Sequence, residues 1–347
     1  MTNTNQKITV SLAQIEQNTF KALVKHGAHD WIAKEVSKAV RLAEATGNLI
    51  CGLYYLESYC NQLSSGRVKG NVEPEINETK PGAVLVDAKF GFAQAAFHRG
   101  LPYALNKVKK NGICLLGISR AHTCTSLGYF TRQIAENNFI GIGFANASSV
   151  VAPPNGIKPV LGTNPIAMSV PNKSGGIEFQ FDQSTSAVAL GKITKAKAAG
   201  EEIPFGWAVD SEGNPTTDPN EALKGSLLST GGYKGWGFGL MVEVMAAALT
   251  GSVNSLDVKG LKERDGPPHD LGQTYILIDP SVFSGDQFWE RIKRLSIAVE
   301  EQEGARLPGT AEVLKDPVNI DKSTWTKVLS LTSVNYMSSS STKRAFS

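Results

Sequence analysis

The chain contains few cysteines, and they show none of the spacings found at zinc sites or in redox motifs. The four, among 347 residues, are Cys51, Cys60, Cys114 and Cys124, and no two form a CxxC pair. Reduced thiols are therefore the expected state. The start of the sequence lacks an apolar core of signal-peptide length, and no apolar run approaches the ~18 residues needed to span a bilayer. We expect a cytoplasmic protein that does not bind membranes.

Charge of one sign is also scarce. The 35 lysines and arginines are nearly balanced by 32 aspartates and glutamates, which leaves a formal charge of +3 at pH 7. The basic residues are scattered rather than clustered, so the sequence does not support nucleic-acid binding. A hydrophobic content of 41% and a length of 347 residues fit a globular protein built from two or three lobes.

Two common nucleotide-binding fingerprints are missing from the sequence. No GxGxxG follows a predicted strand, and no GxxxxGK[ST] occurs. Each fingerprint depends on glycines that let backbone N–H groups reach a phosphate. Neither a Rossmann site nor a P-loop is supported, so a dinucleotide would have to bind to another fold.

The hydrophobic periodicity alternates between helix and strand, which is typical of an α/β fold. Ser11 is a candidate N-cap for the first helix, and Gly47 is a candidate stop for the second. The polar, serine-rich tail over 336–347 is expected to be disordered. Predicted helices lie within 10–47, 51–63, 91–110, 127–137, 187–200, 235–251 and 285–303, and predicted strands cover 83–88, 112–119, 139–147, 166–171, 177–184 and 274–280.

Three short segments combine small residues, hydroxyl groups and turns. They are GTNPIAM over 162–168, FDQSTSA over 181–187 and GGYKGWGFG over 231–239. Glycines let backbone N–H groups approach a phosphate, and Lys234 adds a cation, so together the segments favour an anionic cofactor site. GGYKG is also compatible with a simple turn before a buried helix, with Lys234 in solvent.

Longer segments carry a resemblance to a known family. They include SSGRVKGN, FGFAQAA, ANASSVVAPPNGIKPVLGTNPIAMSVP, FDQSTSAVALGK and LLSTGGYKGWGFGLMVEVMAAALTG. In these segments the chain resembles the malate/L-lactate dehydrogenase family of NAD(P)H-dependent oxidoreductases, and within it the Δ1-piperideine-2-carboxylate and Δ1-pyrroline-2-carboxylate reductases. The resemblance runs from about Ser11 to Gly309.

The resemblance implies an α/β fold that is not of the Rossmann type. It consists of a mixed-sheet cofactor lobe and a composite lobe made from both chain ends, and it forms an intertwined homodimer. The implied division is an N-terminal helical segment over 1–55, a composite lobe over 56–121 with 295–335, and an NAD(P)H-binding lobe over 122–294.

The resemblance also implies NADPH as the cofactor, with NADH as the alternative. Thr123, Thr125 and Ser126 offer hydroxyl donors at the mouth of a helix, which suits phosphate. No metal is implied. The residues expected to contact the cofactor are His122, Thr123, Cys124, Thr125, Ser126, Thr163, Phe181, Asp182, Gln183, Ser184, Tyr233, Lys234, Pro308, Gly309 and Thr310.

The sequence departs from the family where the catalytic groups are expected. Relatives carry Ser-His-Gly and then, three residues later, Arg; the His acts as general acid and the Arg clamps the substrate carboxylate. Here Ile50, Cys51 and Tyr55 replace Ser, His and Arg, and Lys192 replaces an Asp of the imino-acid reductases. Cys51, Tyr55 and Lys192 are therefore the candidate catalytic residues by position.

These replacements favour a C=N bond over a carbonyl as the hydride acceptor. Reducing a carbonyl creates an alkoxide that needs an acid, whereas a protonated imine already carries its proton. Cys51 is either a proton donor or an inert packing residue. The substrate either lacks the usual carboxylate or presents it to another cation such as Lys192 or Arg67. We expect an imine reductase, and the altered pocket favours a specialised biosynthetic pathway; the alternatives are an inactive NAD(P)H-binding paralogue and a 2-oxo acid reductase.

Overall fold

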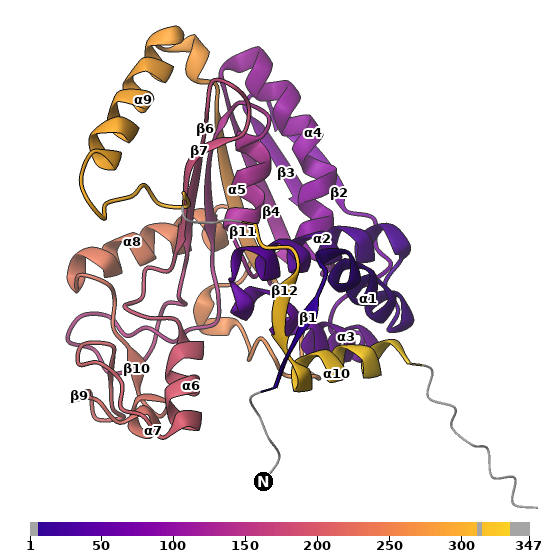
Figure 1. Ribbon diagram of the computed structural model, residues 1–347, viewed down its shortest axis with the longest axis vertical. Helices are drawn as coiled ribbons and strands as arrows, with labels where there is room; N and C mark the ends of the chain where they lie inside the picture. Colours follow the sequence, from indigo (N-terminus) through magenta and orange to yellow (C-terminus); the bar gives the residue numbers. More distant parts are fainter. Residues whose placement is uncertain (1–5, 311–313, 334–347) are drawn as a thin grey trace, which may run out of the picture.

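The computed structural model describes residues 6–310 and 314–333, and a seven-stranded sheet forms its centre (Figure 1). The strand order is β2-β3-β4-β11-β5-β6-β7. Only β3 and β4 run parallel among these neighbours, with Val84 opposite Leu116, so the sheet is mixed, as expected. The strands are β2 (Glu75–Lys80), β3 (Ala83–Asp87), β4 (Ile113–Ala121), β5 (Ile140–Ala145), β6 (Ile166–Pro171), β7 (Ile177–Gln183) and β11 (Leu271–Ile278).

Helices cover both faces of this sheet. On β11, Tyr275 packs with Phe97 of α4 (Ala93–Asn111) and Phe130 of α5 (Gly128–Ala135). The next residue, Ile276, packs instead with Val242 of α8 (Tyr233–Glu243), which continues as the π-helical turn η3 (Val244–Ala248). Because successive strand side chains point to opposite faces, α4 and α5 lie on one side and α8 and η3 on the other.

The two ends of the chain form one lobe, as expected. Strand β1 (Lys7–Val10) pairs antiparallel with β12 (Val318–Asp321). The helices of this lobe share a core that includes Ile15, Leu56 and Trp325. They are α1 (Leu12–Lys25), α2 (Asp30–Thr46), α3 (Leu56–Ser65) and α10 (Lys322–Thr332).

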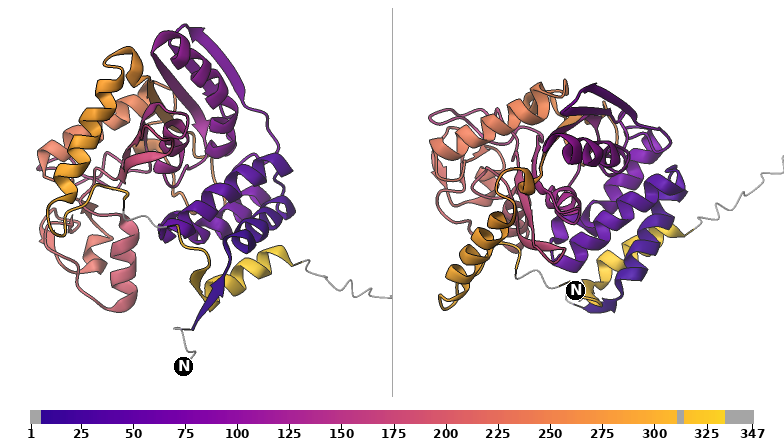
Figure 2. Two further views of the ribbon diagram at one scale, coloured as in Figure 1. Left: turned by 45° about the horizontal axis from the view of Figure 1, so that its top comes forward. Right: turned by 90° about the horizontal axis from the view of Figure 1, so that it is seen from above.

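A smaller unit lies below the sheet in Figure 1 and is built around Val151, Ile193 and Leu227. It contains α6 (Leu190–Ala199), α7 (Pro219–Ala222), β8 (Ala208–Val209), β9 (Pro215–Thr216) and β10 (Ser226–Leu227). The single turns η4 (Ser255–Asp257) and η5 (Pro280–Val282) flank β11. Helix α9 (Asp286–Glu300) projects from the body in the right view of Figure 2.

Most predicted elements are present, and two caps are confirmed. The Ser11 side chain accepts the Gln14 N–H at the start of α1, and Gly47 ends α2 at φ +79°. The helix expected over 51–63 begins only at Leu56, because Gly52 has non-helical backbone angles (φ −96°, ψ −133°) and separates two 3-10 turns. The tail over 336–347 lies outside the described residues.

The expected lobe boundary at 121/122 does not coincide with a break in the sheet. Strand β4, which ends at Ala121, pairs with β11, which belongs to the predicted lobe over 122–294. Strands β2 to β4 therefore share a sheet with β5 to β7. The numerical lobe boundaries remain a prediction. Within 6–310 and 314–333, no helix is both long and apolar enough to cross a membrane.

Candidate functional site

Two 3-10 turns carry the residues that replace the family's catalytic groups. They are η1 (Leu49–Cys51) and η2 (Leu53–Tyr55), between α2 and α3. The buried Glu44 carboxylate accepts the Leu53 N–H at 2.8 Å, and a Cβ at Gly52 would collide with that carboxylate. Burial raises the pKa of Glu44, while its hydrogen bond opposes the shift. Glu44 and Gly52 thus fix the turn that presents Cys51 and Tyr55.

Cys51 and Tyr55 are neutral, partly buried groups on this turn, and the region that they form beside Asp182 is called the recess below. Burial raises the pKa of the Cys51 thiol to about 12, and the negative charge of Asp182 adds to the shift. Burial also raises the pKa of Tyr55 to about 12. Each group keeps its proton at neutral pH and would leave a costly buried anion if it donated that proton. Both are therefore weak acids for catalysis.

The loop after β4 brings His122 into a stack of two histidines. The rings of His122 and His269 lie 4.0 Å apart, nearly parallel, and His122 Nε2 lies 2.6 Å from Gln62 Oε1. Burial lowers the pKa of His122 well below its usual value and that of His269 to about 3. His122 is 1% exposed, so the structure places this predicted cofactor residue inside the protein rather than on an open surface.

Asp182, at the end of β7, caps helix α5. Its Oδ2 accepts the Gly128 N–H at 2.8 Å and the Ser126 hydroxyl at 3.1 Å. Desolvation raises the pKa of Asp182, and these hydrogen bonds oppose the shift. Its charge also raises the pKa of Cys124, as it does that of Cys51. Four predicted site residues from three distant segments therefore meet at one place: Cys51, Cys124, Ser126 and Asp182.

A groove runs along β7 beside α5. Its first part, a cavity of about 370 Å³, is lined by Asn48, Ser126, Asp182, Arg132 and Gln180, among others. The last two also line an adjoining cavity of about 340 Å³, which includes Gly309 and Thr310. The predicted cofactor segments 181–184 and 308–310 therefore border one groove, on either side of Gln180.

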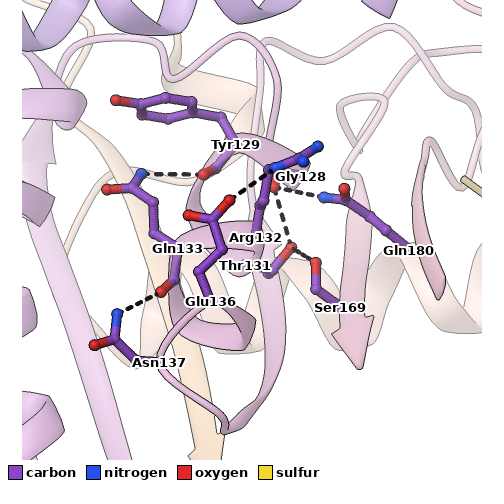
Figure 3. A network of polar contacts seen from close by, with 9 residues as sticks. All are labelled: Gly128, Tyr129, Thr131, Arg132, Gln133, Glu136, Asn137, Ser169 and Gln180. Atoms are coloured by element: carbon purple, nitrogen blue, oxygen red, sulfur yellow. Dashed lines mark hydrogen bonds and ion pairs between the residues drawn. The ribbon is translucent and has the colours of Figure 1, made fainter. Parts of the chain in front are cut away.

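Figure 3 shows how the side chains of this groove are held. The Gln180 amide donates to the Gly128 carbonyl oxygen at 2.6 Å, and Arg132 pairs with Glu136 at 3.1 Å. The Gln180 N–H donates to the Pro308 carbonyl oxygen at 3.0 Å. Arg132 thus supplies a cation beside the groove. It was missed from the sequence because its position depends on α5 lying against β7.

The remaining cofactor segments are joined by backbone hydrogen bonds. The Thr230 N–H donates to Thr185 at 3.0 Å, and the Thr185 N–H donates to Thr163 at 2.9 Å. These bonds place the start of α8, with Tyr233 and the exposed Lys234, beside the end of β7. Tyr233 borders a further cavity of about 730 Å³ that reaches into the small unit.

Lys192 lies on the first turn of α6 and is exposed. Its neighbour Gly191 faces Ile50, since a Cβ there would lie 3.3 Å from Ile50 Cδ1. This places α6 against the turn that carries Cys51, so the three residues chosen by position belong to one region. Lys192 makes no hydrogen bond through its side chain among the described residues.

The structure gives Arg67 a different role from the substrate clamp considered above. Its guanidinium donates to the carbonyl oxygens of Gly260 and Glu263 at 2.9 and 2.6 Å, and to that of Pro267 at 2.9 Å. Arg67 therefore holds the 259–269 loop. That loop carries Lys262, whose Nζ lies 3.1 Å from the Tyr54 ring centroid. About 200 positions separate Arg67 from this loop, so no local sequence pattern predicts that they bind each other.

Comparisons with known proteins identify the family and the fold. The profile of the family described as malate/L-lactate dehydrogenase matches residues 10–327. A (2R)-3-sulfolactate dehydrogenase (NADP(+)) of Chromohalobacter salexigens is 37% identical over 87% of this chain and 90% of its own. A Δ1-pyrroline-2-carboxylate reductase of Pseudomonas fluorescens is 34% identical over 88% and 91%. The solved Δ1-piperideine-2-carboxylate reductase of Pseudomonas syringae superposes with a TM-score of 0.86 at 29% identity, covering 93% of this chain and 99% of that one.

Proposed function

The chain belongs to the malate/L-lactate dehydrogenase family, and on that premise we propose that it is an NADPH-dependent reductase of a C=N bond in a small cyclic imine. The observation that carries the proposal is the recess at 50–55. There, Cys51 and Tyr55 are neutral, weakly acidic groups, and the negative charge of Asp182 acts on Cys51. Relatives named for Δ1-pyrroline-2-carboxylate support the same substrate class.

The groove fits a nicotinamide cofactor. Gly309 has a φ of +81°, and a Cβ there would crowd the Gln180 backbone, so this edge must stay bare. Gly231 and Gly232, at φ +60° and +65°, leave open space before α8. Ser126, Lys234 and Arg132 would supply a hydroxyl and two cations for phosphate groups. NADPH, when bound, supplies the hydride.

The protein's own part in the reaction is electrostatic. An iminium carbon accepts hydride without needing a proton, and the charge of Asp182 favours a cation in the recess. The same charge disfavours an alkoxide, which would otherwise draw its proton from Cys51 or Tyr55 at a pKa of about 12. Imine reduction is therefore the better match to these residues.

Two alternatives define the test. The relative named for sulfolactate is 37% identical, which makes 2-oxo acid reduction the second candidate; an inactive NAD(P)H-binding paralogue is the third. We would follow NADPH consumption with Δ1-piperideine-2-carboxylate and with pyruvate, as kcat/KM. Preference for the imine supports the proposal, and comparable turnover of both substrates overturns it. NADPH binding without turnover of either substrate, or of other cyclic imines, would indicate the paralogue.

We also propose a cytoplasmic homodimer. Helix α8 and η3 cover one sheet face, yet Phe238 (56%), Val244 (54%) and Leu249 (53%), which directly follows η3, are exposed. Monomeric proteins rarely leave such an apolar row in water, so a second copy is the expected cover. All four cysteines are free, which fits a reducing compartment. Light scattering after gel filtration should give twice the mass of 37.1 kDa; a monomer at micromolar concentration would contradict the dimer.

A further inference from the structure

A lysine outside every predicted segment lies over the two tyrosines of the turn at 49–55. Lys262 Nζ is 3.1 Å from the ring centroid of Tyr54 and 5.0 Å from that of Tyr55. Tyr54 is 48% exposed, whereas the Tyr55 hydroxyl lies deep enough for burial to raise its pKa. The ammonium group therefore lies at the surface, over the ring of Tyr54 and near that of the more buried Tyr55, on the turn that also carries Cys51.

The backbone on both sides of Lys262 is fixed by a buried side chain. The Gln62 amide donates to the carbonyl oxygens of Leu261 and Glu263, at 2.9 and 2.7 Å, and Gln62 is fully buried. Arg67, 2% exposed, binds carbonyl groups of the same loop. Gln62 also contacts His122 through its other amide atom. The position of Lys262 is thus built into the core rather than left to a mobile loop.

The charges around the recess call for a cation at this point. Asp182, although exposed to solvent, is close enough to Cys51 for its negative charge to raise the pKa of the thiol, and the same charge would repel an anionic ligand unless a positive group compensates. Arg67 is occupied by three carbonyl groups, and no carboxylate within 6–310 or 314–333 pairs with Lys262. A cation–π contact at an exposed tyrosine is weak, so the ammonium group can exchange it for a carboxylate.

We propose that Lys262 binds the carboxylate of the substrate, with Tyr54 and Tyr55 holding the ammonium group. This inference rests on the proposed imine reduction and narrows it to cyclic imines that carry a ring carboxylate. The positive imine nitrogen would lie toward Asp182, and the carboxylate toward Lys262. A lysine acts as a flexible point charge, so its spatial demands differ from those of a bidentate arginine.

The test compares two substrates that differ only in the carboxylate. Replacing Lys262 by Gln should raise KM for Δ1-piperideine-2-carboxylate about ten- to hundredfold, as expected for losing a charged hydrogen bond. The kcat for that substrate and the reduction of Δ1-piperideine, which lacks the carboxylate, should stay within about twofold of the wild type. Lys262→Arg should retain part of the affinity. Lys259→Gln, on the same loop but away from the tyrosines, is the matched control.

Binding without turnover separates this inference from the proposed function. In the presence of NADP+, pyrrole-2-carboxylate should bind the wild type and bind Lys262→Gln at least about tenfold more weakly. Loss of imine reduction with this difference intact would overturn only the proposed reaction. An unchanged affinity in Lys262→Gln, an equal loss with both imines, or no binding of the ring carboxylate by the wild type would overturn the role of Lys262.

Discussion

The groove along β7 and the turn at 49–55, the two parts of the proposed site, are built from different parts of the chain. The groove is defined by backbone: Gln180 bonds Pro308, Thr185 bonds Thr163, and Gly309 must lack a side chain. The turn is defined by side chains, with Glu44 holding a frame on which Cys51 and Tyr55 are mounted. A backbone site restricts its sequence to short motifs, whereas a side-chain site keeps its frame while its chemistry is exchanged. That difference explains why this chain keeps the family's cofactor segments while the side chains of the turn at 49–55 are exchanged.

The largest expected effect comes from filling the backbone cradle. Gly309→Ala puts a Cβ against Gln180 at a positive φ, which should displace the 308–310 segment. Strain of about 1–3 kcal/mol would raise the Kd for NADPH roughly ten- to hundredfold. Gly304→Ala is the control, because its φ is also positive but nothing lies near its added Cβ. Fluorescence titration that finds the two variants equal would show that close approach at 309 does not matter.

The buried histidine stack, which contacts Gln62, should make stability depend on pH. The folded pKa of His269, about 3, lies below the unfolded value of about 6.5. The stability that the neutral ring contributes is therefore complete above pH 6.5. It is lost as the pH falls below that value, and the loss reaches about 2 kcal/mol at pH 5. Between pH 7 and pH 5, the free energy of unfolding measured in urea should fall by about 2 kcal/mol less in His269→Gln than in the wild type. The surface variant His29→Gln should keep the wild-type loss; identical losses in all three proteins would refute the explanation.

Lys234 tests whether the start of α8 belongs to the cofactor side. It is exposed beside Gly231 and Gly232. Lys234→Ala should weaken NADPH binding by about tenfold, the value of one phosphate contact, and should leave the fold unchanged. Thermal shift against NADPH concentration measures it, with the exposed Lys195→Ala as control. No difference between these variants would assign Lys234 to solvent.

The smallest effect is expected at Cys51, despite its central place. Because burial raises its pKa to about 12, the thiol should fill space in the site rather than donate a proton. Cys51→Ala should cost at most about tenfold in kcat on imines, against ~10²–10⁴ for a true general acid. The pH profile should also stay unchanged across the neutral range, since Tyr55 is likewise not titrating there. A thousandfold loss with native circular dichroism would show that the thiol takes part in the chemistry.

The groove was predictable from the sequence to the extent that backbone defines it. Apolar runs predict strands β3 to β7 and β11, and the glycine-rich segments indicate where the backbone has no room for a side chain. The interrupted turn at 49–55 was not predictable, because it depends on Glu44 reaching Leu53. Lys262 was equally hidden, since Gln62, nearly 200 positions earlier, decides where it lies. Side-chain contacts between distant segments leave no local period in the sequence.

The pairing of β1 with β12 sets an order on the making of the protein. Thr9 bonds Asn319, 310 positions further along, so the first strand waits for nearly the whole chain to be synthesised. Until Val318 and Trp325 arrive, the core around Ile15 and Leu23 is incomplete and its apolar face is open. Such long-range closure is slow and exposes the growing chain to aggregation. The lobe that carries Cys51 is thus the first to leave the ribosome and among the last to be finished.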